Sequence, residues 1–367
     1  MSSSASPVAS SISDRARRHD HEPIRVLIVD DSLTVRTVFS RMVAEAPDME
    51  VVAGERTAEL AIARLRKDHV DVILLDLEMP GMGGLEALPQ LLKTQEDTAV
   101  LVVSSLTDEG AEATVAALSM GAADTMLKPR PGGFDAQYRA ALLEKIRALG
   151  SSNEEAEAAE PAESSRKVSP RKAPVRRTDL IAIGASTGGI HALNLFLRSL
   201  KPNFDLPICV TQHLPASFVS VFARQLEVTS ARRTIIAEDG AIIRRGDIAV
   251  ATGHSHMIIE PDGENFIARL STEPTASGCM PSVDPMLTSL AHACKGRATA
   301  VILSGMGRDG SRGAQDLVEA GGIVIAQDAE TSAVWGMPGA VANAGLASAV
   351  LPPAELAEWL MTDCGIS

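Results

Sequence analysis

The stretch Asp179–Gly189, DLIAIGASTGG, decides how the C-terminal half of the chain is organised. Its apolar run, Leu180 to Ile183, is typical of a short buried strand. Apolar residues then recur at helical spacing, at Ile190, Leu193, Leu197 and Leu200. The glycines around Ser186 permit the tight turn that such a strand-to-helix junction requires. The stretch therefore predicts a strand, a sharp turn and a helix, with a serine in the turn.

Ser186 occupies the place in this turn where a nucleophile is expected. Its hydroxyl would leave a strand end beside a helix N-terminus, which favours negative charge. The letters Gly184 to Gly188 also fit the G-x-S-x-G pattern of serine hydrolases. On this stretch alone, a phosphate-binding glycine loop or a simple turn fits equally well. Further residues are needed to decide between these interpretations.

The composition narrows the classes of protein that fit. A chain of 367 residues is long enough for about two domains. The net charge of 34 − 47 = −13 disfavours nucleic acid and anionic membrane surfaces as partners. The four cysteines show neither metal-binding nor redox spacing, and no apolar run is long enough to span a bilayer. We expect a cytoplasmic protein that does not insert into a membrane.

Composition shifts divide the chain into four segments. Residues 1–22 are serine-rich and then charged, which predicts a disordered tail. Residues 23–149 and 179–367 each alternate predicted strands and helices. Between them, residues 150–178 form an acidic and then a basic stretch with prolines, typical of a flexible linker. The basic half of this linker is an alternative site for an acidic partner, although a solvated tether fits it better.

The first of the two domains, residues 23–149, has five strand–helix units. Five such units predict a parallel sheet covered by helices on both faces, a flavodoxin-like (βα)5 arrangement. In such sheets ligands bind at the carboxyl ends of the strands.

Five polar residues stand at those strand ends: Asp30, Asp31, Asp76, Ser104 and Lys128. A single aspartate there is more often a helix cap, but five matched positions indicate a site. Three clustered carboxylates repel one another unless a hard cation such as Mg²⁺ joins them. The lysine would neutralise a phosphoryl oxygen and the serine hydroxyl would donate to another. The set suits phosphoryl transfer onto a carboxylate.

The motifs IVDDS, LLDLEMPGMGG, VVSS and LKP, in this order between Ile24 and Leu149, resemble the response-regulator receiver family. The resemblance implies that Asp76 accepts a phosphoryl group from a histidine kinase. It implies Asp30, Asp31 and Asp76 as Mg²⁺ ligands, with Ser104 and Lys128 as the switch pair. Receivers usually carry an aromatic residue three positions before the lysine, whereas this chain has Thr125 there.

The second domain, residues 179–367, also predicts a doubly wound, mostly parallel α/β fold. Its region Thr234–Leu270 instead holds short apolar runs with turn signals at Asp239-Gly240 and Asp262-Gly263. These runs predict antiparallel strands or hairpins inserted into the parallel architecture.

Three predicted strands of this domain are followed by reactive residues: Ser186, His213 and Asp309. A serine hydroxyl needs a base to become nucleophilic, and a carboxylate fixes the tautomer of a histidine base. Glycines around Met306 leave its amide free to approach a ligand, so Met306 and Thr187 are the predicted oxyanion donors. The order Ser, His, Asp along the chain differs from that of α/β-hydrolases, so the G-x-S-x-G pattern at Ser186 does not indicate that fold. This chemistry needs no cofactor.

Two alternative sites in the second domain fit less well. His254 and His256 alternate along TGHSHM and would share one face of a strand, as a pair of metal ligands does. No third ligand is near them in sequence. Cys279 is an alternative nucleophile, but no base stands beside it in sequence.

The motifs GASTGG, TQHLP, TGHSHM, PSVDP and LSGMGRDG, spread over about Asp179 to Leu351, resemble the catalytic domain of the chemotaxis protein-glutamate methylesterase family. The resemblance implies Ser186 as nucleophile, His213 as base, Asp309 as its orienting group and the Met306 amide as an oxyanion donor. It also implies hydrolysis of glutamate γ-methyl esters, and deamidation of glutamines, on the cytoplasmic helices of chemoreceptors during adaptation. A basic pair common before PSVD in this family is replaced here by Gly278, Cys279 and Met280.

The two-domain plan predicts an esterase that is gated by phosphorylation. In this hypothesis the unphosphorylated receiver covers the Ser186 cleft, and phosphorylation of Asp76 shifts the equilibrium towards an open site. Two alternatives remain open: a non-catalytic response regulator that binds partners, and a methylesterase-type regulator of a receptor outside chemotaxis.

Overall fold

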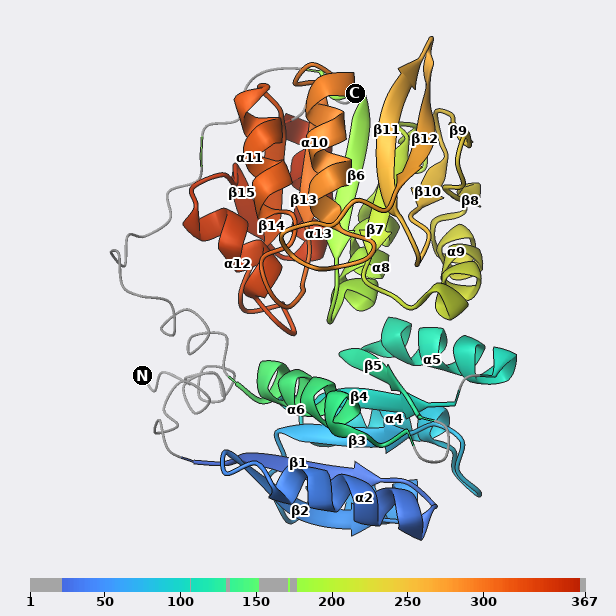
Figure 1. Ribbon diagram of the computed structural model, residues 1–367, viewed down its shortest axis with the longest axis vertical. Coiled ribbons are helices and arrows are strands. Elements are labelled where there is room, and N and C mark those ends of the chain that lie inside the picture. Colours follow the sequence, from blue (N-terminus) through green and yellow to red (C-terminus); the bar gives the residue numbers. More distant parts are fainter. Residues whose placement is uncertain (1–21, 106, 130–132, 152–170, 172–176, 364–367) are drawn as a thin grey trace, which may run out of the picture. The chain divides into compact units, whose positions relative to one another are not determined.

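The computed structural model describes residues 22–105, 107–129, 133–151, 171 and 177–363 (Figure 1). The predicted disordered tail and nearly all of the predicted linker therefore lie outside the described residues. The described chain divides into two compact units and its strands form three sheets. None of the helices in the described part has the length and apolar character needed to cross a bilayer.

The N-terminal sheet has five strands in the order β2-β1-β3-β4-β5. The strands are β1 (Ile24–Val29), β2 (Met49–Glu55), β3 (Val72–Asp76), β4 (Ala99–Ser104) and β5 (Asp124–Leu127). Strand β1 pairs in parallel with both β2 and β3. Every residue of β3 is buried, as expected for a strand with helices on both faces. The predicted flavodoxin-like arrangement is confirmed.

Most helices of this sheet begin after a residue whose side chain caps the helix, whereas Gly83 supplies no such cap. The helices are α2 (Leu33–Ala44), α3 (Ala58–Leu65), α4 (Gly84–Thr94), α5 (Asp108–Met120) and α6 (Ala136–Gly150). The side chains of Ser32, Thr57 and Asp135 accept backbone N–H groups in the first turns of α2, α3 and α6. Such side chains satisfy amides that the helix itself leaves unpaired.

The C-terminal domain contains a seven-stranded sheet in the order β15-β14-β13-β6-β7-β10-β8. Its strands are β6 (Leu180–Ala185), β7 (Ile208–Gln212), β8 (Thr234–Ile236), β10 (Ile248–Val250), β13 (Ala298–Ile302), β14 (Ile323–Gln327) and β15 (Ala349–Leu351). The chain runs from β6 to β7 on one side and later returns to β13 on the other. The carboxyl end of β6 is therefore a topological switch point, where open α/β sheets bind ligands.

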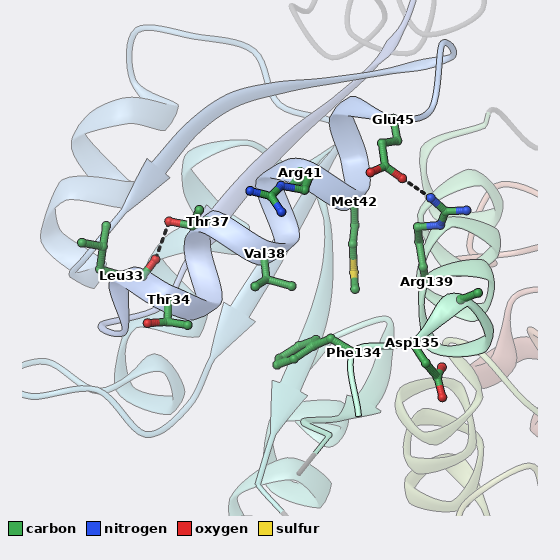
Figure 2. Close-up of a pocket in the computed structure, with 11 residues that line it drawn as sticks. Leu33, Thr34, Thr37, Val38, Arg41, Met42, Glu45, Phe134, Asp135 and Arg139 are labelled. Carbon is green, nitrogen blue, oxygen red and sulfur yellow. Dashed lines mark hydrogen bonds and ion pairs between the residues drawn. The ribbon is translucent and has the colours of Figure 1, made fainter. Parts of the chain in front are cut away.

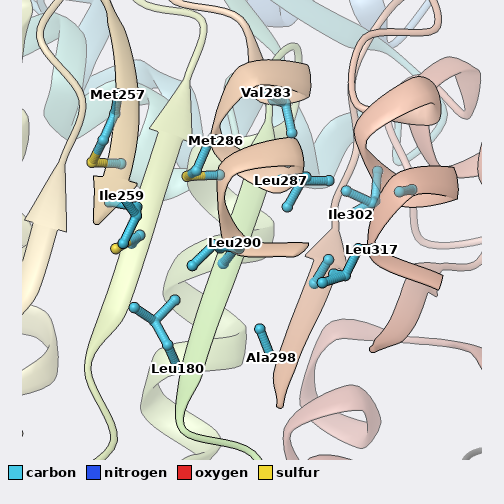
Figure 3. Packing of buried hydrophobic residues seen from close by; sticks show 14 of the residues in the cluster. Leu180, Met257, Ile259, Val283, Met286, Leu287, Leu290, Ala298, Ile302 and Leu317 are labelled. Atoms are coloured by element: carbon cyan, nitrogen blue, oxygen red, sulfur yellow. The ribbon is translucent and has the colours of Figure 1, made fainter. Parts of the chain in front are cut away.

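The helices of this domain in the described residues are α8 (Gly189–Ser199), α9 (Ala216–Ser230), α10 (Val283–Ala293), α11 (Ser311–Glu319), α12 (Gly336–Asn343) and α13 (Pro353–Asp363). Figure 1 labels each of them. Helix α10 presents Val283, Met286, Leu287 and Leu290 to the buried core (Figure 3). These side chains are fully buried with Met257, Leu180 and Ile302 from three different strands. This core fixes the start of α10 next to the strand ends that carry the predicted triad.

The prediction for Thr234–Leu270 is correct only in part. Strands β11 (His256–Asp262) and β12 (Asn265–Ser271) form the predicted antiparallel hairpin, and β9 (Ile242–Ile243) pairs antiparallel with β12. Strands β8 and β10, however, extend the main sheet in parallel with β7. Their runs of three residues are too short to distinguish parallel from antiparallel pairing by periodicity. Helix α12 and strand β15 were not predicted, because α12 is short and rich in alanine and glycine and β15 has only three residues.

Candidate active site and phospho-acceptor site

The pairing of β6 with β7 brings Ser186 and His213 to the same edge of the sheet. Ala185 pairs with Gln212, and Ser186 and His213 directly follow these two strand ends. The His213 N–H donates to the carbonyl of Ala185 at 3.0 Å. Neighbouring strands lie about 4.8 Å apart. The two residues are thus adjacent at the topological switch point.

Close backbone packing shapes the turn that holds Ser186. The Ser186 N–H donates to the carbonyl of Ser304 at 3.0 Å, which ties the turn to the segment after β13. Gly188 has a φ of 77°, a conformation that side-chain-bearing residues rarely adopt. A Cβ at Gly305 would lie 2.8 Å from the Cβ of Ser186. The loop of residues 304–310, SGMGRDG, can therefore approach Ser186 only because residue 305 is glycine.

Asp309 meets His213 from this loop. The distance from His213 Nε2 to Asp309 Oδ2 is 2.8 Å, and the aspartate side chain is 1% exposed. Two further donors hold the carboxylate in place: the Ser282 hydroxyl at 2.6 Å and the Val283 N–H at 2.7 Å. Both donors stand at the start of α10, the element fixed by the apolar core.

These contacts shift the pKa values of both partners. Burial raises the pKa of Asp309. Hydrogen bonds from His213, Ser282 and Val283 outweigh burial and lower this pKa to about 2. Burial lowers the pKa of His213, but its interactions with Asp309 and Cys279 outweigh burial and raise that pKa above 6.5. Asp309 is therefore an ionised group that stabilises an imidazolium when one forms.

The amides of the predicted oxyanion donors make no backbone hydrogen bond in the described residues. Within the described part of the chain, neither the Met306 N–H nor the Thr187 N–H donates to a backbone carbonyl. Met306 follows Gly305 and precedes Gly307, which has a φ of 78°. Thr187 follows the serine directly. Unpaired backbone amides beside a nucleophile are the groups that stabilise a developing oxyanion.

The structure adds Cys279, a residue that the sequence did not connect with the triad. Its Sγ, a His213 ring nitrogen and an Asp309 carboxylate oxygen all lie within 4.8 Å of one another. No base stands beside Cys279 in sequence, but the fold brings His213 near it from the end of a distant strand. The signal that the sequence offered was its place before PSVDP, where the resemblance implies a basic pair.

The pairing of His254 and His256 as metal ligands, the less favoured alternative, does not form. His254 is exposed in a turn, whereas His256 is 1% exposed at the start of β11. Both ring nitrogens of His256 contact backbone: Nε2 lies 2.9 Å from the Glu273 carbonyl, and Nδ1 accepts the Ser282 N–H at 2.9 Å. His256 therefore ties together the two ends of residues 273–282, the loop that carries Cys279.

In the N-terminal domain, Asp30, Asp31 and Asp76 converge as predicted. One carboxylate oxygen from each lies within 4.8 Å of the others, and Asp30 and Asp76 are each 2% exposed. Backbone amides orient two of them: Ser32 N–H donates to Asp30 Oδ1 at 2.9 Å, and Glu78 N–H donates to Asp76 Oδ1 at 3.1 Å. The oxygen-only set fits a hard cation such as Mg²⁺.

Ser104 and Lys128 end β4 and β5 of the same sheet. The Lys128 N–H donates to the Ser104 carbonyl at 2.7 Å, so the two residues are neighbours. The Ser104 side chain is 1% exposed, and its hydroxyl has no hydrogen-bond partner among the described residues. The Thr125 hydroxyl also has no hydrogen-bond partner among the described residues, and Thr125 is 7% exposed. A buried hydroxyl without a partner is costly unless a ligand supplies one.

A separate pocket lies between α2 and the start of α6 (Figure 2). Leu33, Val38, Met42 and Phe134 contribute to its lining, and an ion pair between Glu45 and Arg139 stands at one side. No predicted site residue lines this pocket. The acidic cluster and the pocket are thus different features of the domain.

Comparison with known proteins identifies the class to which these two sites belong. Residues 26–133 match the response regulator receiver domain, and residues 181–360 match the CheB methylesterase family. The chain belongs to the CheB methylesterase family and carries a receiver domain. The resemblances noted in the sequence and the prediction of a hydrolase are therefore confirmed.

The relatives extend over nearly the whole chain. A Rhodospirillum rubrum protein named protein-glutamate methylesterase/protein-glutamine glutaminase 1 is 41% identical, covering 92% of this chain and 95% of its own length. A Caulobacter vibrioides protein named protein-glutamate methylesterase/protein-glutamine glutaminase 2 is 42% identical, and the match covers 92% of this chain and 98% of that protein. Among solved structures, the Thermotoga maritima CheB methylesterase catalytic domain is 36% identical with a TM-score of 0.48, covering 50% of this chain and 97% of that one.

Proposed function

We propose that this chain hydrolyses glutamate γ-methyl esters, and deamidates glutamines, on the cytoplasmic helices of chemoreceptors. The observation that carries the proposal is the 2.8 Å contact between His213 and Asp309 beside the Ser186 turn. The names of the relatives supply the substrate class. In this function Ser186 is the nucleophile, His213 the base and Asp309 the group that orients the base.

The hydrogen bond to Asp309 supports a different role for each nitrogen of the His213 ring. In the neutral imidazole, the proton on Nε2 is donated to Asp309 Oδ2, so the lone pair is on Nδ1. Nδ1 therefore takes the proton of Ser186 as the hydroxyl oxygen attacks the ester carbonyl. The transient imidazolium is stabilised by the ionised Asp309.

The reaction then proceeds in two halves. The carbonyl oxygen becomes an oxyanion, which the amides of Met306 and Thr187 stabilise. Collapse of this intermediate expels the methoxy group, which leaves as methanol with the proton from His213. Water, deprotonated by His213, then attacks the acyl-serine and releases the glutamate carboxylate and free Ser186. With a glutamine substrate the first leaving group is ammonia.

The acidic cluster supports a second proposal, that Asp76 accepts a phosphoryl group from a histidine kinase. Asp30, Asp31 and Asp76 would hold Mg²⁺, which would neutralise charge on the phosphoryl group. The partnerless hydroxyl of Ser104 would donate to one phosphoryl oxygen, and Lys128 would pair with another. Phosphorylation would then increase the esterase rate by shifting a conformational equilibrium.

The experiment that tests the esterase proposal is methanol release from receptor-containing membranes that carry methyl-esterified glutamates. The wild-type chain should release methanol, and Ser186→Ala should release it at least about 10³-fold more slowly, as loss of a triad nucleophile does. A Ser186→Ala variant that keeps the wild-type rate would refute the assignment.

A further inference from the structure

We propose that Cys279, His213 and Asp309 form a binding site for a borderline-soft divalent metal ion, typified by Zn²⁺, and that the bound ion switches the esterase off. The inference rests on the proposed function, because it concerns the residue assigned as the base. It goes beyond that function, since the esterase reaction itself uses no metal.

The three side chains supply the ligand atoms that Zn²⁺ prefers: a thiolate sulfur, an imidazole nitrogen and a carboxylate oxygen. In a tetrahedral zinc site with bonds of about 2.0–2.3 Å, ligand atoms lie about 3.3–3.5 Å apart. Here the three atoms already lie within 4.8 Å of one another, so a shift of roughly 1 Å completes the geometry. A water molecule would take the fourth position.

Two of the ligands are held in position by the fold rather than by the ion. Asp309 is fixed by Ser282 and Val283, and its side chain is 1% exposed. The loop of residues 273–282 is tied at both ends to His256, which keeps Cys279 over the same strand ends. Preorganised ligands with hydrogen-bonded supports are what distinguish a metal site from a chance encounter of side chains.

The Cys279 ligand is also accessible from solvent. Cys279 is partly buried, and its neighbours Gly278 and Met280 are exposed, so an ion can reach the thiol without unfolding. The other two cysteines in the described residues, Cys209 and Cys294, are buried at 0% and 1% exposure. Burial raises the pKa of both these thiols, which disfavours their metal-binding thiolate form.

Binding of the ion removes the base in either of its possible arrangements. The Cys279 thiol loses its proton to solvent, and the ion takes one lone pair of the neutral His213 ring. If the ion binds Nε2, the ring proton resides on Nδ1; if it binds Nδ1, that lone pair is occupied. In both cases no nitrogen can accept the proton of Ser186. A metal ion bound at this site therefore inhibits the esterase while the protein remains folded.

Cobalt(II) substitution of the full chain tests this site directly. Metal-free protein titrated with Co²⁺ should develop a thiolate-to-cobalt charge-transfer band that saturates at one equivalent. Cys279→Ser should lose that band, and His213→Ala should bind at least about 10-fold more weakly, because loss of even a supporting group costs this much. Cys364→Ser is the matched control and should behave as wild type. A band that persists in Cys279→Ser would overturn the proposal.

A parallel assay connects the site to activity. Zn²⁺ should slow methanol release by the wild type and by Cys364→Ser, and EDTA should restore it. Each variant is compared with its own metal-free rate, and Cys279→Ser should show at least about 10-fold lower sensitivity to Zn²⁺. Equal sensitivity of Cys279→Ser and wild type would refute the inhibitory role. A protein with the cobalt band but no metal-free esterase activity would refute the proposed function and leave the metal site standing.

Discussion

At the scale of single residues, Asp309 controls the state of the proposed base, His213. Its buried carboxylate accepts from His213, Ser282 and Val283, and these bonds keep it ionised. Through His213 it selects the nitrogen that carries the ring proton and raises the pKa of the ring. Both effects lead to measurable consequences.

Asp309→Asn should reduce kcat/KM on the order of 10⁴-fold, because an amide does not enforce the productive tautomer. The pH profile should also move. An imidazole is a base only when neutral, so the wild-type rate rises as pH increases through a pKa that lies above 6.5. Without the carboxylate this pKa falls, and the rising limb moves to lower pH.

The measurement is kcat/KM for methyl-ester hydrolysis across the pH range in which both proteins remain folded. Asp316→Asn is a matched control, since Asp316 accepts from Thr288 on the neighbouring helix. A rising limb at the same pH in Asp309→Asn and wild type would contradict the role assigned to this carboxylate.

At the scale of elements, loop 273–282 depends on His256 for its position. His256→Ala removes both contacts and leaves the Ser282 N–H and the Glu273 carbonyl without the ring as partner, at a cost of about 1–3 kcal/mol. Ser282 holds Asp309, so kcat should fall more than KM rises. His256→Gln offers a donor and an acceptor and should recover part of the loss.

Steady-state kinetics separate this positioning role from general destabilisation. Hydrogen exchange should show faster exchange confined to residues 273–282 in His256→Ala. If exchange increases throughout the domain and kcat per folded molecule is unchanged, His256 only stabilises the fold.

Close packing of α4 on β3 gives a second prediction at this scale. A Cβ at Gly84 would lie 2.0 Å from the carbonyl oxygen of Asp76, so Gly84→Ala must displace the helix or the strand end. We expect the free energy of unfolding of the receiver to fall by about 1–3 kcal/mol. Gly54→Ala is the control, because its Cβ would meet only the Arg36 side chain, at 3.6 Å. The measurement is the urea midpoint of receiver unfolding in the wild type, Gly84→Ala and Gly54→Ala. Equal midpoints in all three would contradict this account.

The elements also show what sequence alone can and cannot supply. Strand β6, the turn at Ser186 and helix α8 could be predicted, because apolar runs and glycines report local structure. His213 and the acidic cluster could be predicted for the same reason, because they follow apolar runs that the sequence identifies as strands. The proximity of Cys279 to His213 could not be predicted, because it depends on a loop anchored 17 residues from His256 at one end and 26 at the other. The parallel pairing of β8 and β10 is likewise set by long-range register.

At the scale of the whole molecule, one chain carries an acidic cluster that we propose as a phosphoryl acceptor and a Ser186, His213 and Asp309 set that we propose as a hydrolytic triad. If phosphorylation of Asp76 controls the triad, acetyl phosphate with Mg²⁺ should increase the rate of methanol release. Asp76→Asn should remove this stimulation, because its amide cannot form the acyl phosphate. EDTA should remove it as well, because Mg²⁺ offsets the charge during transfer.

The control for this prediction is basal activity. Asp76→Asn without acetyl phosphate should retain the unstimulated rate of the wild type if Asp76 acts only as phosphoryl acceptor. Stimulation that survives in Asp76→Asn would show that acetyl phosphate acts elsewhere.

The most direct test of the central claim is single-turnover hydrolysis of methyl-esterified receptor by metal-free protein, with detection of the acyl-enzyme by mass spectrometry. Rapid quenching of the wild type should trap receptor peptide esterified to Ser186, and His213→Ala should yield little of this adduct. An adduct on Cys279, or methanol release at the wild-type rate without any adduct on Ser186, would contradict the account.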